Sequence, residues 1–264
     1  MDIGKIRRKI NLMLVLLIAT LTFSLINSNP SIGVSADNDK HPIYSVDTTE
    51  KKLSITFDVN WGTDHTKEIL DILDKYNVKA TFFVIGKWIN YSEDNAKLLA
   101  EIKSRGHEIG NHSNSHADFT KINKEKIREE INLTDEKIKK ITGEEVELFR
   151  FPSGAYNSSA VNIVNEYKHL PVQWSSDSVD WKEKGADVEY NKVMKGVAPG
   201  AIFLFHNNAK YTPENLDRLI PKLQSEGYEF VKVSDLIYKE NFYINSNGKQ
   251  IKKWYVEIYR SNVL

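Results

Sequence analysis

Seven short apolar runs alternate with helix-like segments along this chain, and this alternation limits the folds that it can adopt. The runs span residues 53–57, 81–85, 107–111, 147–149, 171–175, 201–205 and 228–231. Alternating strands and helices are typical of a parallel α/β fold, and seven units predict an incomplete (β/α) barrel. A flat, doubly wound sheet is the alternative. It would spread the strand ends along one edge instead of gathering them in a ring.

Helix-like segments fill the intervals between the runs. We expect helices at residues 66–76, 92–105, 124–142, 158–167, 188–195, 213–225 and 234–239. Gly106, Gly143 and Gly227 lie just past the ends of three of these segments, where a left-handed residue commonly ends a helix.

Polar residues that can carry chemistry stand just after the apolar runs. They are Asp58, His112, His116, Arg150, Asp177, Asp180 and His206. In a barrel of parallel strands, the loops that follow the strands converge on one open face. We therefore expect side chains from Asp58 to His206 to meet in a single site, which is the layout of an enzyme.

The N-terminal segment, residues 1–36, predicts export from the cytoplasm. A basic cluster from Lys5 to Lys9 precedes an apolar stretch at residues 12–26, as in a secretory signal peptide or an N-terminal membrane anchor. Cleavage after Ala36 and retention as an anchor are both open. In either case we expect an extracytoplasmic protein of the cell wall or spore envelope, whose only membrane contact is this segment.

The remaining chain divides into three parts by composition. We expect a linker at residues 37–47, the barrel at residues 48–240 and an extension at residues 241–264. In the extension, Asn247–Gly248 separates apolar residues, which predicts a β-hairpin. We expect this hairpin to cover the bottom or an edge of the barrel, and an aromatic surface that contacts glycan is the alternative.

Composition excludes several classes of function. The chain has 36 Lys and Arg against 36 Asp and Glu, so no net charge attracts nucleic acid, and we expect no nucleic-acid partner. It contains no Cys, which excludes disulfides, thiolate metal sites and cysteine nucleophiles.

Two histidines indicate a metal site. His112 and His116 are four residues apart, and on one helical turn this spacing places both imidazoles within reach of one divalent ion. Arg150 directly follows another run, and we expect it to pair with the carboxylate of Asp58. Asp58 as a helix cap or turn residue is the structural alternative.

A second pair of residues suggests acid catalysis. Burial at the end of the run 201–205 would lower the pKa of His206, and a nearby carboxylate such as Asp180 would restore its protonated form. A structural histidine is the alternative. The loop after Arg150 contains Pro152 and Gly154, which could aim the backbone N–H of Tyr156 into the cavity.

These motifs together resemble a known family. Thr56-Phe57-Asp58, His112-Ser-Asn-Ser-His116, Arg150-Phe-Pro-Ser-Gly-Ala-Tyr156, Asp177-Ser-Val-Asp180-Trp181 and Leu204-Phe-His206 follow one another in the order found in polysaccharide deacetylases. These are metal-dependent carbohydrate esterases of family 4, and the resemblance covers residues 48–238. It implies an incomplete (β/α) barrel and hydrolysis of N-acetyl groups on amino sugars.

The resemblance also implies a role for each residue. Asp58 would be the general base, oriented by Arg150, and His206 the general acid, tuned by Asp180. His112 and His116 would bind a divalent metal ion, expected to be zinc. The backbone N–H of Tyr156 would hold the oxyanion, and Trp181 and Leu204 would line the acetyl pocket.

One position departs from the family pattern. The family has a second aspartate directly after the first, as the third metal ligand, and this chain has Val59. The resemblance therefore implies weaker metal binding, unless Asn60, Asp64 or His65 replaces the missing ligand. The variant Asp-x-x-Trp-Gly, here Asp58 to Gly62, resembles the exported branch of the family that is linked to sporulation in Gram-positive bacteria.

Two functions remain after this comparison. The first is an exported deacetylase of cell-wall glycan, with peptidoglycan during spore formation as its substrate, and Asp58, Arg150 and His206 favour it. The second is a catalytically silent glycan-binding protein, which Val59 favours. A cytoplasmic amidohydrolase conflicts with the N-terminal segment.

Overall fold

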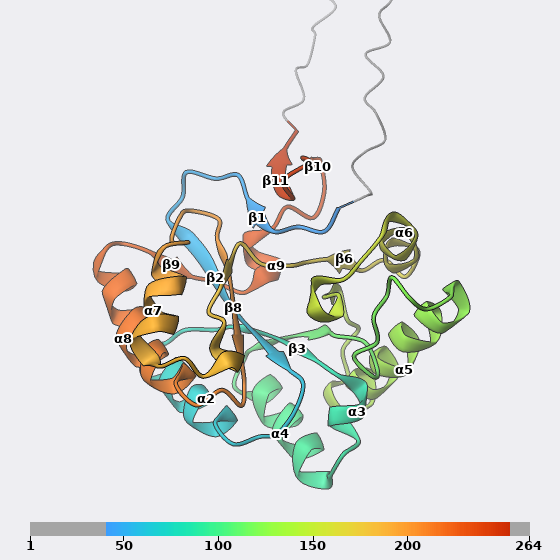
Figure 1. The fold of residues 1–264 in the computed structure, drawn as a ribbon, viewed down its shortest axis with the longest axis horizontal. Helices are drawn as coiled ribbons and strands as arrows, with labels where there is room; N and C mark the ends of the chain where they lie inside the picture. Colours follow the sequence, from blue (N-terminus) through green and yellow to red (C-terminus); the bar gives the residue numbers. More distant parts are fainter. Residues whose placement is uncertain (1–40, 254–264) are drawn as a thin grey trace, which may run out of the picture. The chain divides into compact units, whose positions relative to one another are not determined.

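A curled sheet of parallel strands forms the centre of the domain (Figure 1). The computed structural model describes residues 41–253. Seven strands follow one another across the sheet in the order β6, β5, β4, β3, β2, β8 and β7, and β9 pairs with β2 beside this path. The strands are β2 (Lys52–Val59), β3 (Thr81–Val84), β4 (Glu108–Asn111), β5 (Leu148–Phe149), β6 (Leu170–Pro171), β7 (Ser176–Asp177), β8 (Ile202–His206) and β9 (Glu229–Phe230). The expected incomplete barrel is thereby confirmed.

One expected strand is instead two. The run at residues 171–175 contributes its first residue to β6, and β7 begins just after it, at the opposite end of the sheet. Between them the chain crosses the open side of the barrel, because Val172 N–H donates to Phe149 of β5 and Ser175 N–H donates to Ile202 of β8. Apolar composition does not reveal which neighbour a residue pairs with, so the crossing was missed.

Helices cover the outer face of the sheet (Figure 1). They are α2 (Thr66–Lys75), α3 (Gly86–Ile89), α4 (Glu93–Ser104), α5 (Lys124–Thr142), α6 (Ser158–Glu166), α7 (Ala186–Met194), α8 (Thr212–Ser225) and α9 (Val233–Leu236). Ser92, Asn123 and Asn157 cap three of them by accepting a backbone N–H three residues further on. The three expected glycine ends all have positive φ. The short helix α3 was not expected.

The two faces of β2 serve different purposes. Ile55 and Phe57 lie in the apolar core that includes residues of α2, α4 and α8, and the Phe57 ring stacks on Phe82 with centroids 4.7 Å apart. Each such buried ring contributes about 1.5–3 kcal/mol of hydrophobic stabilisation. Thr56 and Asp58 alternate with them and point into the barrel, where they contact Arg150. The strand therefore anchors the domain with one face and presents polar groups with the other.

A second, small sheet joins both ends of the described chain. The strands β10 (Phe242–Ile244) and β11 (Lys249–Lys252) form an antiparallel hairpin, as expected, and β1 (Ser45–Val46) pairs in parallel with β11. The Asn245 carboxamide oxygen accepts N–H groups from Asn247 and Lys249, both at 3.0 Å, which fixes the turn. Residues 254–264 of the expected extension lie outside the described residues.

Residues 41–47 of the expected linker are part of this packed structure, and residues 37–40 lie outside the described residues. Ile43 is fully buried and Val46 nearly so, in the same apolar cluster as Ile244. The backbone N–H of Ile43 donates to Pro171 at 2.8 Å. The polar composition of the segment concealed these two apolar anchors.

The N-terminal segment at residues 1–36 lies outside the described residues. Within residues 41–253, none of the helices has both the length and the apolar character that crossing a membrane requires.

A close backbone approach attaches β1 to the barrel, and it leads to a prediction. Gly200 has a φ of +77°, and a Cβ there would lie 1.9 Å from the carbonyl oxygen of Val46. Gly143 has the same φ but open space around it. We expect Gly143→Ala to lower the free energy of unfolding by about 1–2 kcal/mol, and Gly200→Ala by about 1–3 kcal/mol more. Urea unfolding of both variants measures this difference, and equal losses would show that β1 is not held against the barrel.

Candidate active site

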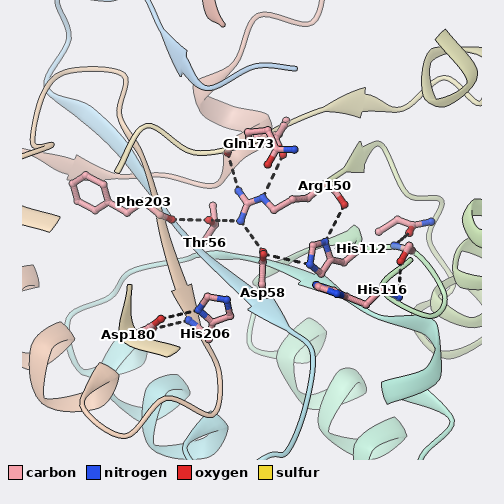
Figure 2. Close-up of polar contacts among 12 residues, drawn as sticks. Thr56, Asp58, His112, His116, Arg150, Gln173, Asp180, Phe203 and His206 are labelled. Carbon is pink, nitrogen blue, oxygen red and sulfur yellow. Dashed lines mark hydrogen bonds and ion pairs between the residues drawn. The ribbon is translucent and has the colours of Figure 1, made fainter. Parts of the chain in front are cut away.

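The carboxyl ends of the parallel strands bring the expected residues together (Figure 2). Asp58 of β2 stands opposite His206 of β8 in the strand register, and Arg150 directly follows β5. A cavity of about 500 Å³ opens at this face, and Asp58, His116 and His206 are among the residues that line it. Residues far apart in sequence thus meet at one point, because the strand ends share one edge of the sheet.

Arg150 is fully buried and donates to four oxygens inside the barrel. Its Nη1 donates to Oδ1 of Asp58 at 2.9 Å and to Oγ1 of Thr56 at 2.8 Å. Its Nη2 and Nε donate to the carbonyl groups of Gln173, at 3.0 Å, and Val172, at 3.3 Å. A buried cation needs such a full set of acceptors. The expected contact between Arg150 and Asp58 is therefore present, and it also ties β2 to the segment that crosses the barrel opening.

Asp58 is held in its ionised form. Burial alone would raise the pKa of its carboxyl. The charge of His112, which is protonated only below about pH 4, and the charges of Arg150 and His206 outweigh burial and hold that pKa below its ordinary value. The alternative role as a helix cap does not apply, since Asp58 lies within β2 and its two oxygens face Arg150 and His112. A buried, ionised carboxylate at the cavity floor can accept a proton.

His112 has one nitrogen occupied and one facing the site. Its Nδ1 lies 2.9 Å from the carbonyl oxygen of Arg150, so the proton is assigned to Nδ1. Its Nε2 then has a free lone pair and lies 3.3 Å from Oδ2 of Asp58. Burial lowers the pKa of His112 to about 4, so the imidazole is neutral at pH 7. Nε2 of His112 and Oδ2 of Asp58 are then two neighbouring acceptors that repel each other. A cation bound to both would stabilise them.

The two histidines do not share a helical turn, contrary to expectation. They lie in a loop after β4, in which Ser113 and His116 have φ of 68° and 59°. The loop nevertheless brings the imidazoles together, with ring centroids 5.2 Å apart. The spacing of four was thus consistent with a shared site, but a left-handed loop rather than a helix produces it.

A buried carboxylate explains why this loop has its shape. Glu130 of α5 is fully buried, and its Oε2 accepts the backbone N–H groups of Asn114 and Ser115 at 3.0 and 2.7 Å. Its Oε1 accepts the hydroxyl of Ser115 at 2.8 Å. Sequence reasoning missed Glu130, because it stands among charged residues of an amphipathic helix. Its only signal is that it occupies the apolar face between Ile127 and Ile131.

His206 is prepared to be protonated. Its Nδ1 lies 2.7 Å from Oδ1 of Asp180, and Oδ2 of Asp180 accepts the backbone N–H of His206 at 2.8 Å and the hydroxyl of Thr212 at 2.6 Å. Burial alone would lower the pKa of His206, but Asp180, with Asp58 and Asp177, raises it above its ordinary value. The expected partnership with Asp180 is present, and Thr212 is an addition that the sequence did not indicate.

The residues expected to bind substrate are placed less uniformly. Trp181 and the nearly buried Leu204 both line the cavity. The ring of Tyr156 instead packs against Phe151, with centroids 5.6 Å apart, and its hydroxyl lies 3.4 Å from that of Tyr44. Ser153, from the same loop as Tyr156, is among the residues that line the cavity.

The candidate metal ligands at this cavity supply only part of the coordination that a metal ion requires. His112 offers an unpaired Nε2, and His116 lines the same cavity. A catalytic zinc ion normally has three protein ligands. Among the side chains of residues 41–253, no three of His, Cys, Asp or Glu are grouped to hold an ion. Val59, at the expected third position, is fully buried in the apolar core.

One nearby side chain is better placed than the others to substitute for this ligand. Asn60 lines the cavity, and its buried Oδ1 has no hydrogen-bond partner among the described residues. Nδ1 of His65 instead lies 3.4 Å from Oε2 of Glu68, and Asp64 is exposed. The two imidazoles thus fit a weaker site than three strong ligands would form.

Comparison with known proteins agrees with this geometry. Residues 45–172 match the family model for polysaccharide deacetylases. The chain is 33% identical over 207 residues to the peptidoglycan-N-acetylmuramic acid deacetylase PdaA of Bacillus subtilis, which covers 77% of this chain and 78% of PdaA. It is 36% identical over 203 residues to the peptidoglycan-N-acetylglucosamine deacetylase PgdA of Listeria monocytogenes, covering 76% of this chain and 41% of PgdA. The chain therefore spans less than half the length of PgdA.

A solved structure from Bacillus anthracis adds a relevant contrast. BA3943, described as a pseudoenzyme of carbohydrate esterase family 4, superimposes with a TM-score of 0.70 at 34% identity, over 74% of this chain and 68% of BA3943. A mutant of BA3943 is described as having restored enzymatic activity. The extent of the match to PdaA and the shared barrel establish that this chain belongs to the polysaccharide deacetylase family.

Proposed function

We propose that this protein hydrolyses N-acetyl groups on the amino sugars of cell-wall glycan, with peptidoglycan as its substrate. The observation that carries the proposal is the pairing of opposite pKa shifts in one cavity. Asp58 has a lowered pKa and His206 a raised pKa, so near neutral pH one is a base and the other an acid. Amide hydrolysis needs both.

The reaction assigns one proton transfer to each residue. Asp58 takes a proton from a water molecule as the water oxygen attacks the acetyl carbonyl carbon. The C–N bond then breaks, and His206 gives its Nε2 proton to the departing nitrogen. The products are acetate and a free amino sugar. Positioned acids and bases of this kind typically contribute 10²–10⁴-fold each.

Other groups support these transfers. We assign Leu204 and Trp181 to the pocket for the acetyl methyl group, and the backbone N–H of Tyr156 to the oxyanion. His112 and His116 would hold a divalent ion, zinc in this proposal, and such an ion would polarise the acetyl carbonyl. The residues above account for water activation and nitrogen protonation without it.

The place of action follows from the N-terminal segment. The basic cluster followed by residues 12–26 supports export, with the barrel outside the cytoplasm, secreted or anchored at the cell wall or spore envelope. The variant from Asp58 to Gly62 supports the sporulation-linked branch of the family. Peptidoglycan lies on the same side of the membrane, which is consistent with the proposed substrate.

One observation favours a second function, glycan binding without catalysis. Val59 stands where the third metal ligand is expected, and it is fully buried among apolar residues. The likeness to BA3943 supports the same reading, because that protein is described as a pseudoenzyme. The intact acid and base favour the enzyme, since a binding protein needs neither.

Acetate release from purified peptidoglycan separates the two functions. We expect the wild-type protein to release acetate, faster with added zinc, and Asp58→Asn to be slower by about 10²–10⁴-fold because the base is lost. Unfolding midpoints show whether Asp58→Asn stays folded. Val59→Asp should increase release only when zinc is present. Release by Val59→Asp with none by the wild type would support the silent binding protein, and release by neither would contradict the deacetylase.

The pKa of His206 tests the role of Asp180. Because burial alone lowers this pKa, Asp180→Asn should bring it below about 6.5, the value of an isolated histidine. In the wild type, His206 has a higher pKa in the folded than in the unfolded protein, so its protonation stabilises the fold. This stabilisation is complete at pH values below the unfolded-state pKa and is lost as pH rises through the folded-state pKa. NMR titration of the imidazole protons measures the pKa of His206 in both proteins. His112, whose pKa is about 4, serves as the internal control. An unchanged His206 pKa would remove Asp180 from this role.

A further inference from the structure

One exposed tryptophan at the catalytic cavity has no role in the reaction described above. Trp61 follows β2, lines the cavity with Asp58 and His206, and is 61% exposed. Scattered exposed aromatic residues are ordinary on protein surfaces. Trp61 differs from them because its exposed ring borders the cavity that holds the acid and the base.

The position of Trp61 is fixed by its neighbour in the chain. The carbonyl oxygen of Gly62 accepts Nε1–H of Trp88 at 2.8 Å and the side-chain amide of Asn207 at 3.1 Å. These donors come from α3 and from the loop after β8, so two separate parts of the barrel hold this turn. Gly62 has a φ of +62°, which glycine adopts without strain. The ring is therefore presented at the rim by an ordered backbone.

The neighbours of Trp61 in the cavity limit which part of a ligand its ring can contact. Its ring lies beside His116, with centroids 6.3 Å apart and planes at 57°, and most of its surface stays free. Leu204 and Trp181 already account for the acetyl group under the proposed function. The free face of Trp61 is thus available to a part of the ligand other than the acetyl group.

The chemistry of an aromatic face selects the ligand. One face of a pyranose ring carries C–H groups and is apolar, while an aromatic ring has a negative face that attracts such hydrogens. A large ring with few rotatable bonds also loses little conformational entropy on binding. A sugar ring attached to the reacting sugar meets these conditions.

We propose that Trp61 is a stacking platform for a sugar next to the one that is deacetylated, so that the site binds a glycan chain rather than a single amino sugar. This inference rests on the proposed function for the identity of the ligand. It does not require catalysis, because stacking contributes to binding whether or not the acetyl group is removed.

The test measures binding as a function of chain length. Tetrasaccharide and disaccharide fragments of peptidoglycan without peptides are titrated by calorimetry into the full-length protein with Asp58→Asn, which slows turnover. We expect the tetrasaccharide to bind more tightly than the disaccharide. Trp61→Ala in this background should weaken tetrasaccharide binding about tenfold, or about 1.4 kcal/mol, and leave disaccharide binding unchanged.

Two further variants serve as controls. Trp61→Phe should retain most of the chain-length preference, because a smaller aromatic face remains. Tyr91→Ala removes a ring that is 85% exposed and is not among the cavity-lining residues, and it should change neither affinity. Equal binding of the two fragments, no binding of either, or a Trp61→Ala protein that binds the tetrasaccharide like its parent would overturn the proposal. Chain-length preference without acetate release from the wild type would contradict the proposed function alone.

Discussion

The buried ion pair between Arg150 and Asp58 is the interaction on which the barrel and its site both depend. Arg150 is fully buried, and a guanidinium in that position is tolerated only because oxygens from several segments surround it. These acceptors lie on β2 and on the segment that crosses the open side of the barrel, Val172 and Gln173. One side chain thus ties β2 to the segment that crosses the open side of the barrel, and the same contact orients the Asp58 carboxylate.

The charges near this pair give each titratable group its state. Asp58 stays ionised beside Arg150, while burial keeps His112 neutral, with its unpaired Nε2 toward Asp58. At the same cavity, the contact with Asp180 raises the pKa of His206 above its ordinary value, although burial alone would lower it. Two acid–base groups with opposite pKa shifts in one cavity mark a candidate functional site. Val59 is the exception, because the resemblance places a metal ligand at this position and the side chain of Val59 is apolar and fully buried.

Residues whose role depends on strand ends could be predicted from the sequence, and residues whose role depends on loop shape could not. Asp58 and Arg150 each directly follow an apolar run, so the parallel fold alone brings them together. The loop of His112 and His116 depends on Glu130, which resembles any other charged residue of an amphipathic helix. The division of the run 171–175 between two edges of the sheet depends on long-range backbone pairing, which composition does not encode.

A double-mutant cycle on Asp58 and Arg150 tests this account most directly. The free energy of unfolding is measured for the wild type, Asp58→Asn, Arg150→Met and the double variant. Each single substitution should cost about 3–5 kcal/mol, because it leaves a buried charge unpaired, and the double variant should cost clearly less than their sum. Additive costs, within about 0.5 kcal/mol, would contradict the claim that this pair holds the site together.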